Sequence, residues 1–225
     1  MTTAADANPI TIADRVATMH EGMAGQIPDE VLAVFGAEQA RLDARGIPVD
    51  VAQPGEALGE FDLLDVYGSP TNLTAALGQR TAIVVLYRGA WCPYCNLALR
   101  AYQEDLAPTL ADMGVQLVAI SPQKPDGSLS AKEKNELTFT VLSDPGNKIA
   151  SRLGVITAAS EEAQTAQQSL GIDLAEVNAD GTQVVPMPTV LIVDGAGVIR
   201  WIDVHPNYTT RTEVTDILAA LRSLS

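Results

Sequence analysis

Positive charge is scarce in this 225-residue chain. Lys and Arg together number 14 against 28 Asp and Glu, which gives a formal net charge of −14. Proteins that bind nucleic acids or anionic membranes neutralise phosphates with a surplus of Lys and Arg. Because the chain has no such surplus, we expect neither a nucleic acid nor a membrane as its partner.

Long hydrophobic runs are also absent. The longest uninterrupted apolar stretches, residues 82–87 and 190–193, fall far short of the roughly 20 residues that a membrane-spanning helix needs. Residues 1–9 contain neither the basic nor the apolar segment of a secretory signal. We therefore expect the protein to work in the cytoplasm.

Cysteine and histidine occur only twice each. A zinc site takes about four ligands, and His20 and His205 are too far apart in sequence to indicate a ligand pair beside Cys92 and Cys95. We therefore expect no metal and no other cofactor. Two inert buried cysteines remain an alternative, but a cytoplasmic pair three positions apart is more typical of catalysis.

The remaining composition is that of a folded globular chain, with 47% hydrophobic and 19% charged residues. Helical periodicity predicts helices at 10–23 and 28–45, and a Pro- and Gly-containing linker follows at 48–59. We therefore divide the chain into an N-terminal helical extension, residues 1–50, and a main domain, residues 51–225.

The main domain alternates short apolar runs with helical patterns, which predicts an α/β fold. Strands are expected at 61–66, 81–87, 115–120, 189–193 and 198–204, and helices at 93–112, 129–136, 145–153, 160–170 and 210–223. Residues 82–87 do not alternate, so they indicate a central strand buried on both faces. The Asp-Gly-Ala-Gly turn at 194–197 predicts an antiparallel hairpin at one edge, and hence a mixed sheet flanked by helices.

The chemistry is concentrated where the strand ending at Tyr87 turns into a helix. Pro93 suits the first helical position, which makes Cys92 the N-cap. Backbone N–H groups, the helix dipole and the charge of Arg88 should then lower the pKa of the Cys92 thiol. Cys95 follows one turn later, within disulfide range of Cys92. The pair therefore predicts reversible thiol–disulfide chemistry.

A strand, Trp-Cys-x-x-Cys, a helix and a Pro-Thr pair before a late strand together resemble the thioredoxin fold. Residues 87–96, 119–123, 142–147 and 193–200 resemble, in order, the peroxiredoxin-like members of the alkyl hydroperoxide reductase/thiol-specific antioxidant (AhpC/TSA) family. The resemblance covers about residues 58–223. It implies a thioredoxin-like mixed β-sheet flanked by helices, preceded by the helical extension.

The resemblance also implies a cis Met187–Pro188 bond that lies against the cysteine pair. Supporting roles near the two cysteines fall to Arg88, Trp91, Pro93, Tyr94, Pro188 and Thr189. For Trp91 and Tyr94, a substrate-facing surface and simple packing are equally open. His205 is expected to be a solvated loop residue.

The sequence departs from the peroxiredoxin motif Pro-x-x-x-Thr/Ser-x-x-Cys. Arg88 stands at the Pro position, Cys92 at the Thr position and Cys95 at the position of the cysteine that attacks peroxide. The late-strand arginine of the family falls on Pro188, so we expect that arginine to be missing. With less charge to stabilise the developing oxyanion, peroxide turnover should be slower.

The implied function is the reduction of a hydroperoxide. Cys95 would be oxidised to a sulfenic acid, Cys92 would condense with it to a disulfide, and thioredoxin or a low-molecular-weight thiol would reduce that disulfide. Two alternatives stay open: a thioredoxin- or glutaredoxin-like disulfide reductase with Cys92 as nucleophile, and a non-catalytic thioredoxin-fold binding module. The amphipathic extension can pack on its own domain or on a second subunit, so a homodimer also stays open.

Overall fold

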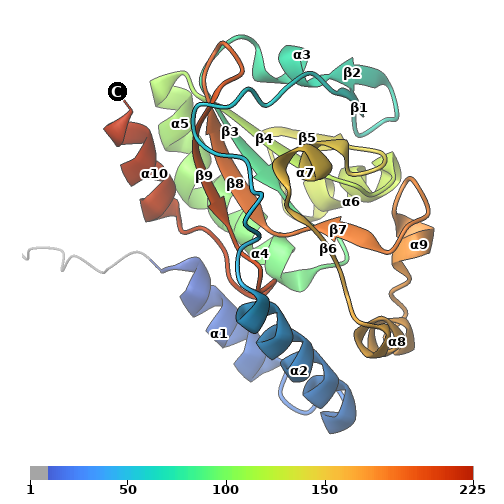
Figure 1. Cartoon of the computed structure of the whole chain (residues 1–225). Coiled ribbons are helices and arrows are strands. Elements are labelled where there is room, and N and C mark those ends of the chain that lie inside the picture. The colour runs from blue at the N-terminus through green and yellow to red at the C-terminus, as the bar shows by residue number, and fades with distance from the viewer. Residues whose placement is uncertain (1–9, 225) are drawn as a thin grey trace, which may run out of the picture.

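The computed structural model describes residues 10–224, and its first elements are the two helices predicted for the extension, α1 (Ile12–Gly22) and α2 (Asp29–Arg45). α1 begins with a capping box in which Thr11 and Asp14 each accept a backbone N–H of the other. α2 ends at Gly46, whose φ of 68° suits a residue without a side chain. The two helices lie along the lower edge of the molecule in Figure 1.

Seven strands form the central sheet in the order β2-β1-β5-β4-β3-β8-β9. Their bounds are β1 (Asp62–Leu64), β2 (Pro70–Asn72), β3 (Ala82–Leu86), β4 (Gln116–Ser121), β5 (Thr140–Ser143), β8 (Thr189–Val193) and β9 (Ile199–Val204). β3, β4 and β5 run parallel, whereas β8 pairs antiparallel with β3, and β9 with β8. The mixed sheet and the β8–β9 hairpin confirm the prediction.

Helices cover both faces of the sheet (Figure 1). One face carries α4 (Pro93–Ala101), a π-helical turn η1 (Tyr102–Leu106), α5 (Ala107–Met113), α6 (Pro125–Lys134) and α10 (Val214–Ser223). The other carries α3 (Leu73–Leu77) and α7 (Lys148–Leu153). A small antiparallel sheet of β6 (Ile156–Ala158) and β7 (Val184–Pro186) lies apart, with α8 (Glu161–Ser169) and α9 (Leu174–Val177) between its strands in the chain.

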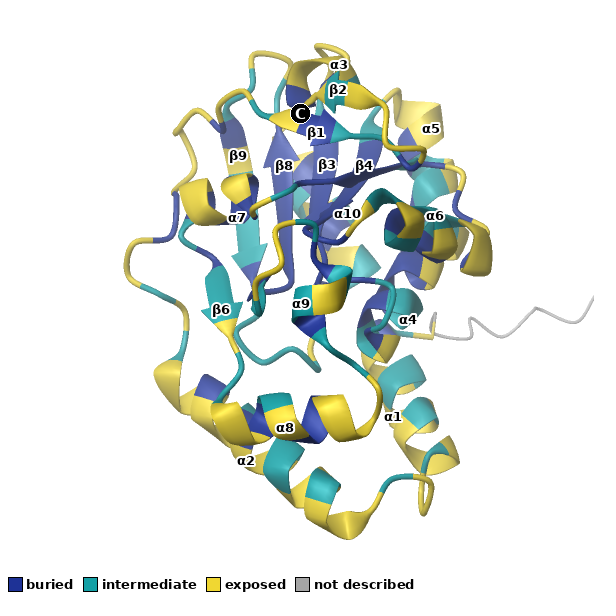
Figure 2. Ribbon diagram, turned by 90° about the vertical axis from the view of Figure 1, so that its right-hand side faces the viewer, coloured by how far each residue is buried: buried dark blue, intermediate teal, exposed yellow. Residues whose placement is uncertain are grey.

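β3 shows why its sequence is continuously apolar. Ile83 and Val85 pack on the face with α4, while Val84 and Leu86 pack on the face with α7. Since both faces are covered by helices, every residue of the strand is buried, as Figure 2 shows for β3 and β8. The prediction of a central, doubly buried strand is confirmed.

Several short elements and several helix boundaries differ from the prediction; the last helix, expected from residue 210, begins at Val214, which leaves Arg211 in the preceding loop. β2, β5, β6, β7, α3 and α9 were not predicted, because three to five residues carry too little periodicity to identify an element. α6 begins at Pro125, four residues earlier than expected, because proline suits the first helical turn. The segment 48–59 is not a free linker: Val51 and Leu58 are buried in the core.

The Met187–Pro188 bond was expected to be cis, and this expectation is wrong: all described peptide bonds are trans. The chain runs extended from β7 into β8, and the N–H of Met187 donates to the Val155 carbonyl at 2.7 Å. The Pro188 carbonyl accepts the N–H of His205 at 2.9 Å. These two bonds hold the extended trans path on both sides of the proline.

Three chain segments enter or leave the sheet at the same end of its strands. Leu86, at the end of β3, pairs with Thr189, at the start of β8, and Thr189 pairs in turn with Val204, at the end of β9. The turn after β3, the residues before β8 and the residues after β9 therefore lie together. The cysteine pair is on the first of these segments.

Candidate redox site

The turn between β3 and α4 depends on Gly89. Its φ is 148°, and a Cβ there would stand 2.4 Å from the ring nitrogen of Trp91 and 3.0 Å from Oε1 of Gln123. That Gln123 oxygen accepts the N–H of Ala90 at 2.9 Å. Only glycine lets the chain turn this tightly and deliver the two cysteines to the start of the helix.

Cys92 is the N-cap of α4 and Pro93 its first residue, as predicted. Both cysteines are reduced and buried, with 1% of Cys92 and 0% of Cys95 exposed. The Cys92 sulfur, however, accepts no N–H from the first turn of the helix. The capping bond that was expected to favour a Cys92 thiolate is therefore missing.

Arg211 is the cation that donates hydrogen bonds to the two sulfurs. Its Nη2 donates to Sγ of Cys95 at 3.1 Å and to Sγ of Cys92 at 3.8 Å. Its Nη1 donates to the carbonyls of Tyr208 and Thr210, each at 2.6 Å. These carbonyls orient the guanidinium so that its second nitrogen points at Cys95.

The two thiols differ strongly in acidity. Burial opposes a charge on Cys95, but a hydrogen bond from Cys92 and the charges of Arg211 and Arg88 outweigh it and hold the pKa of Cys95 well below its usual range. Burial and the neighbouring Cys95 thiolate raise the pKa of Cys92 well above it. The site therefore holds a Cys95 thiolate beside a Cys92 thiol, the reverse of the assignment predicted from the helix start.

The pKa of Arg211 is also shifted in the direction that favours the charged form. Its burial lowers the pKa of the guanidinium, but attraction to Cys95 and Cys92 outweighs burial, so the pKa lies above its ordinary value. Arg211 thus stays charged beside the thiolate. Each charge stabilises the other in a site from which water is largely excluded.

Arg88 is the other cation at the site, and it is buried, with 5% of the residue exposed. Its guanidinium lies between two rings, 4.7 Å from the centroid of Trp91 and 4.4 Å from that of Tyr208. No carboxylate within residues 10–224 forms an ion pair with it. Its charge is therefore balanced by the ring faces and by the Cys95 thiolate.

Tyrosines surround the sulfurs as neutral phenols. Burial raises the pKa of Tyr87 and that of Tyr94 to about 12, and it also raises the pKa of Tyr102 and of Tyr208. The Tyr94 hydroxyl is hydrogen bonded to Nε2 of His20 at 2.8 Å, so Tyr94 contacts the extension. At neutral pH the negative charge next to the guanidiniums is that of Cys95.

A cavity of about 10 Å³ lies beside Cys95 and is also lined by Pro188, Thr189 and Arg211. This is room for about one water-sized molecule. Thr189 uses its hydroxyl to donate to the Met187 carbonyl at 2.9 Å, so it shapes the cavity wall. Pro188 thus lies near the cysteines, although its peptide bond is trans.

His205 lies in a loop, as expected, but its side chain is partly buried and both ring nitrogens have partners. Its Nε2 is 3.0 Å from Oδ2 of Asp203, and its Nδ1 is 2.8 Å from Oγ1 of Thr210. The ring bridges the end of β9 and the loop that carries Arg211. His205 therefore contributes to holding that loop.

The sequence analysis did not identify Arg211. It expected the late-strand arginine of the family to be missing because Pro188 stands in its place, whereas Arg211 brings a positive charge to Cys95 from a later loop. The signal available was topological. The 194–197 turn reverses the chain, so the last strand runs back to the end of the sheet where the cysteines lie. Arg211 is the first Arg or Lys after that strand. Within residues 10–224, no cluster of three or more His, Cys, Asp or Glu could hold a metal ion, and no helix is long and apolar enough to cross a bilayer.

Comparison with known proteins gives a family match over most of the main domain. The model of the AhpC/TSA family matches residues 54–202. Peroxiredoxin Bcp of Escherichia coli (strain K12) is 33% identical over 101 residues, which is 45% of this chain and 64% of that protein. A putative peroxiredoxin of Mycobacterium tuberculosis is 31% identical over 101 residues, or 45% of this chain and 63% of that one. The match thus spans just under two thirds of these relatives.

Solved structures share the fold at low sequence identity. Reduced Prx3 from Vibrio vulnificus, determined in complex with H₂O₂, superposes with a TM-score of 0.61 at 18% identity and covers 76% of this chain and 99% of its own. Peroxidoxin BcpB from Mycobacterium tuberculosis gives 0.59 at 19% identity, covering 77% and 98%. These similarities confirm the thioredoxin-like fold.

Proposed function

Because the chain belongs to the AhpC/TSA family, we propose that it is a thiol-dependent peroxidase that reduces hydroperoxides through Cys95 and Cys92. The observation that carries the proposal is the contact of Arg211 Nη2 with Cys95 Sγ at 3.1 Å. A cation there stabilises the attacking thiolate and the charge that develops on the peroxide oxygens. The small cavity at the same sulfur gives one oxygen a place to approach.

In the oxidative step, the Cys95 thiolate attacks the near oxygen of ROOH and breaks the O–O bond. The sulfur gives up two electrons and becomes a sulfenic acid, and the leaving RO⁻ takes a proton and departs as ROH. Cys92 then attacks the Cys95 sulfur, forms the disulfide and releases water. Because Cys92 is a thiol with a raised pKa, its proton is available for the leaving hydroxide.

In the reductive step, two thiol equivalents return the disulfide to Cys92 thiol and Cys95 thiolate. Thioredoxin or a low-molecular-weight thiol fits this role, since either supplies two electrons by thiol–disulfide exchange. A cytoplasmic setting would provide such a reductant, because that compartment keeps thiols reduced.

The roles of the two sulfurs are tested by serine variants treated with H₂O₂. Cys92→Ser should react once with peroxide and yield a sulfenic acid on Cys95 that a dimedone-type reagent traps. Cys95→Ser should react slower by about two orders of magnitude or more, because its remaining Cys92 sulfur is buried and lies 3.8 Å from Arg211 Nη2, against 3.1 Å for Cys95. Mass spectrometry of the trapped adduct and stopped-flow rates measure both effects.

The other outcomes identify the rival functions. If Cys95→Ser instead traps a mixed disulfide with a protein substrate and neither variant reacts rapidly with peroxide, the chain is a disulfide reductase. If both variants react no faster than free cysteine with peroxide and with disulfides, the fold is a binding module. Either result would overturn the peroxidase proposal.

A further inference from the structure

The loop that carries Arg211 is bound directly to α1 of the extension. The two carboxylate oxygens of Glu213 accept the backbone N–H groups of Ile12, at 2.8 Å, and Ala13, at 2.9 Å. These N–H groups are among those at a helix start that have no partner inside the helix. The Thr11 side chain already takes the next one, from Asp14, so Glu213 completes the cap of α1.

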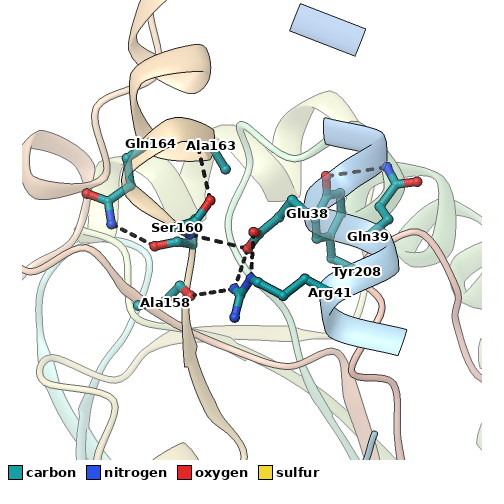
Figure 3. A network of polar contacts seen from close by, with 9 residues as sticks. Glu38, Gln39, Arg41, Ala158, Ser160, Ala163, Gln164 and Tyr208 are labelled. Atoms are coloured by element: carbon teal, nitrogen blue, oxygen red, sulfur yellow. Dashed lines mark hydrogen bonds and ion pairs between the residues drawn. The ribbon is translucent and has the colours of Figure 1, made fainter. Parts of the chain in front are cut away.

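α2 binds the same loop at two further residues. Gln39 Nε2 donates to the Tyr208 hydroxyl at 3.4 Å, and Asn207 Nδ2 donates to Asp43 at 3.0 Å. Figure 3 shows Gln39 reaching Tyr208 from one side of α2, while Glu38 reaches the start of α8 from the other. Since the Tyr208 carbonyl also orients Arg211, α2 contacts the residue that aims the guanidinium.

Behind Arg211 the loop is anchored to the main domain. The Tyr102 hydroxyl donates to the Thr212 carbonyl at 2.7 Å, and Thr212 Oγ1 donates to Asp203 at 2.9 Å. Thr212 is therefore held on the sheet side, and Glu213 is held on the extension side. Arg211 lies directly before this doubly anchored pair.

We propose that Glu213 is a positioning residue for Arg211: by binding the start of α1, it fixes the loop that places the guanidinium on Cys95, so the extension completes the site. This rests on the proposed function, because the placement of Arg211 matters for peroxide only if Cys95 is the attacking sulfur. Glu213 acts through Arg211 and forms no described contact with either sulfur.

A positioning role and a purely electrostatic role for Glu213 predict opposite changes in the pKa of Cys95 when Glu213 is removed. Glu213 carries a negative charge, so removing it should lower the pKa of Cys95 if its charge acts only through space. Releasing Arg211 removes a positive charge and should raise that pKa. The other charged or titratable groups that face the sulfurs stay unchanged in the test: Arg88, Tyr87, Tyr94, Tyr102 and Tyr208.

The test uses the full-length Cys92→Ser protein, in which Cys95 is the sole thiol, and the pH dependence of its alkylation by iodoacetamide. Glu213→Ala should raise the pKa of Cys95 by about one unit, since a close opposite charge shifts a pKa by about 1 to 3 units and Arg88 remains. Glu213→Gln keeps one acceptor oxygen for α1 and should give a smaller rise. Asp216→Ala removes an exposed acid from the first turn of α10 and should leave the profile unchanged.

An unchanged or lowered pKa in a folded Glu213→Ala protein would overturn the proposal. If that variant does not fold, as judged by circular dichroism, Glu213→Gln decides alone: a rise supports positioning, and no rise contradicts it. The readout uses no peroxide, so it is independent of peroxidase activity. Absence of turnover in the unaltered protein would refute the peroxidase function without changing the alkylation result.

Discussion

At the scale of single residues, the main question is why Cys95 and not Cys92 carries the charge. A helix N-terminus contributes about 0.3 to 1 kcal/mol to an anion placed there. A hydrogen bond from a charged donor contributes about 1.5 to 3 kcal/mol. Arg211 makes the shorter contact with Cys95, 3.1 Å against 3.8 Å, so the larger effect acts on the second cysteine.

Replacing Arg211 should therefore impair both ionisation and peroxide reduction. In Arg211→Met we expect the pKa of Cys95 to rise and the rate of oxidation by H₂O₂ to fall about 10²- to 10³-fold, as when an oxyanion donor is removed. Arg211→Lys should lose less, because it keeps the charge without the forked donors. Stopped-flow oxidation measured against pH checks this. A rate that recovers fully above the new pKa would show that Arg211 acts on the thiolate alone.

At the scale of elements, the extension docks through a buried carboxylate. Glu38 on α2 is 4% exposed, accepts two hydrogen bonds from Arg41 at 2.9 and 2.7 Å, and accepts the N–H of Ser160 at 3.4 Å (Figure 3). Burial raises the pKa of Glu38, but Arg41 and Ser160 together outweigh it, so the pKa lies below its usual value. Glu38 thereby joins α2 to the start of α8.

Docking of α2 should therefore weaken in acid. A carboxyl with a lowered pKa stabilises the fold above its unfolded-state value of about 4.3, and this stability is lost as pH falls through the lower, folded value. Glu38→Gln should lower the free energy of unfolding at pH 7 by about 1 to 3 kcal/mol. Below pH 4 the difference from the unaltered protein should shrink. Urea unfolding at both pH values tests this, with exposed Glu30→Gln as control. A constant difference would contradict it.

At the scale of the whole molecule, an acidic chain places two arginines at one buried thiolate. The net charge is −14, yet Arg88 and Arg211 meet at Cys95. Oxidation to the disulfide removes the negative charge of Cys95 beside them. The short loop closed by Cys92 and Cys95 constrains the unfolded chain less than the 15-residue loop that is worth about 3 kcal/mol.

We therefore expect mild oxidation to consume both thiols within one chain and to leave the stability of the protein little changed or lower. Thiol titration should fall from two to zero, and a non-reducing gel should show a monomer band. Urea unfolding of the two redox forms measures the stability. Two thiols that survive H₂O₂ treatment, or a disulfide-linked dimer, would contradict the intramolecular disulfide.

Much of the fold could be predicted because its signals are local. The apolar run at 82–87, the turn at 194–197 and the periodicity of 28–45 each report an element within a few residues. β5 and the small sheet could not be predicted in this way. Their strands have three or four residues and form only because distant strands offer them hydrogen-bonding partners.

The sequence by itself determined that Cys92 and Cys95 lie one helical turn apart at the start of a helix, because Gly89 and Pro93 dictate a tight turn followed by a first helical residue. Only the tertiary structure decided which sulfur is the thiolate. The deciding cation, Arg211, is 116 positions from Cys95 along the chain, and the return of β9 brings it within 3.1 Å. Acidity depends on charge at close range, and close range across that separation is set by folding alone.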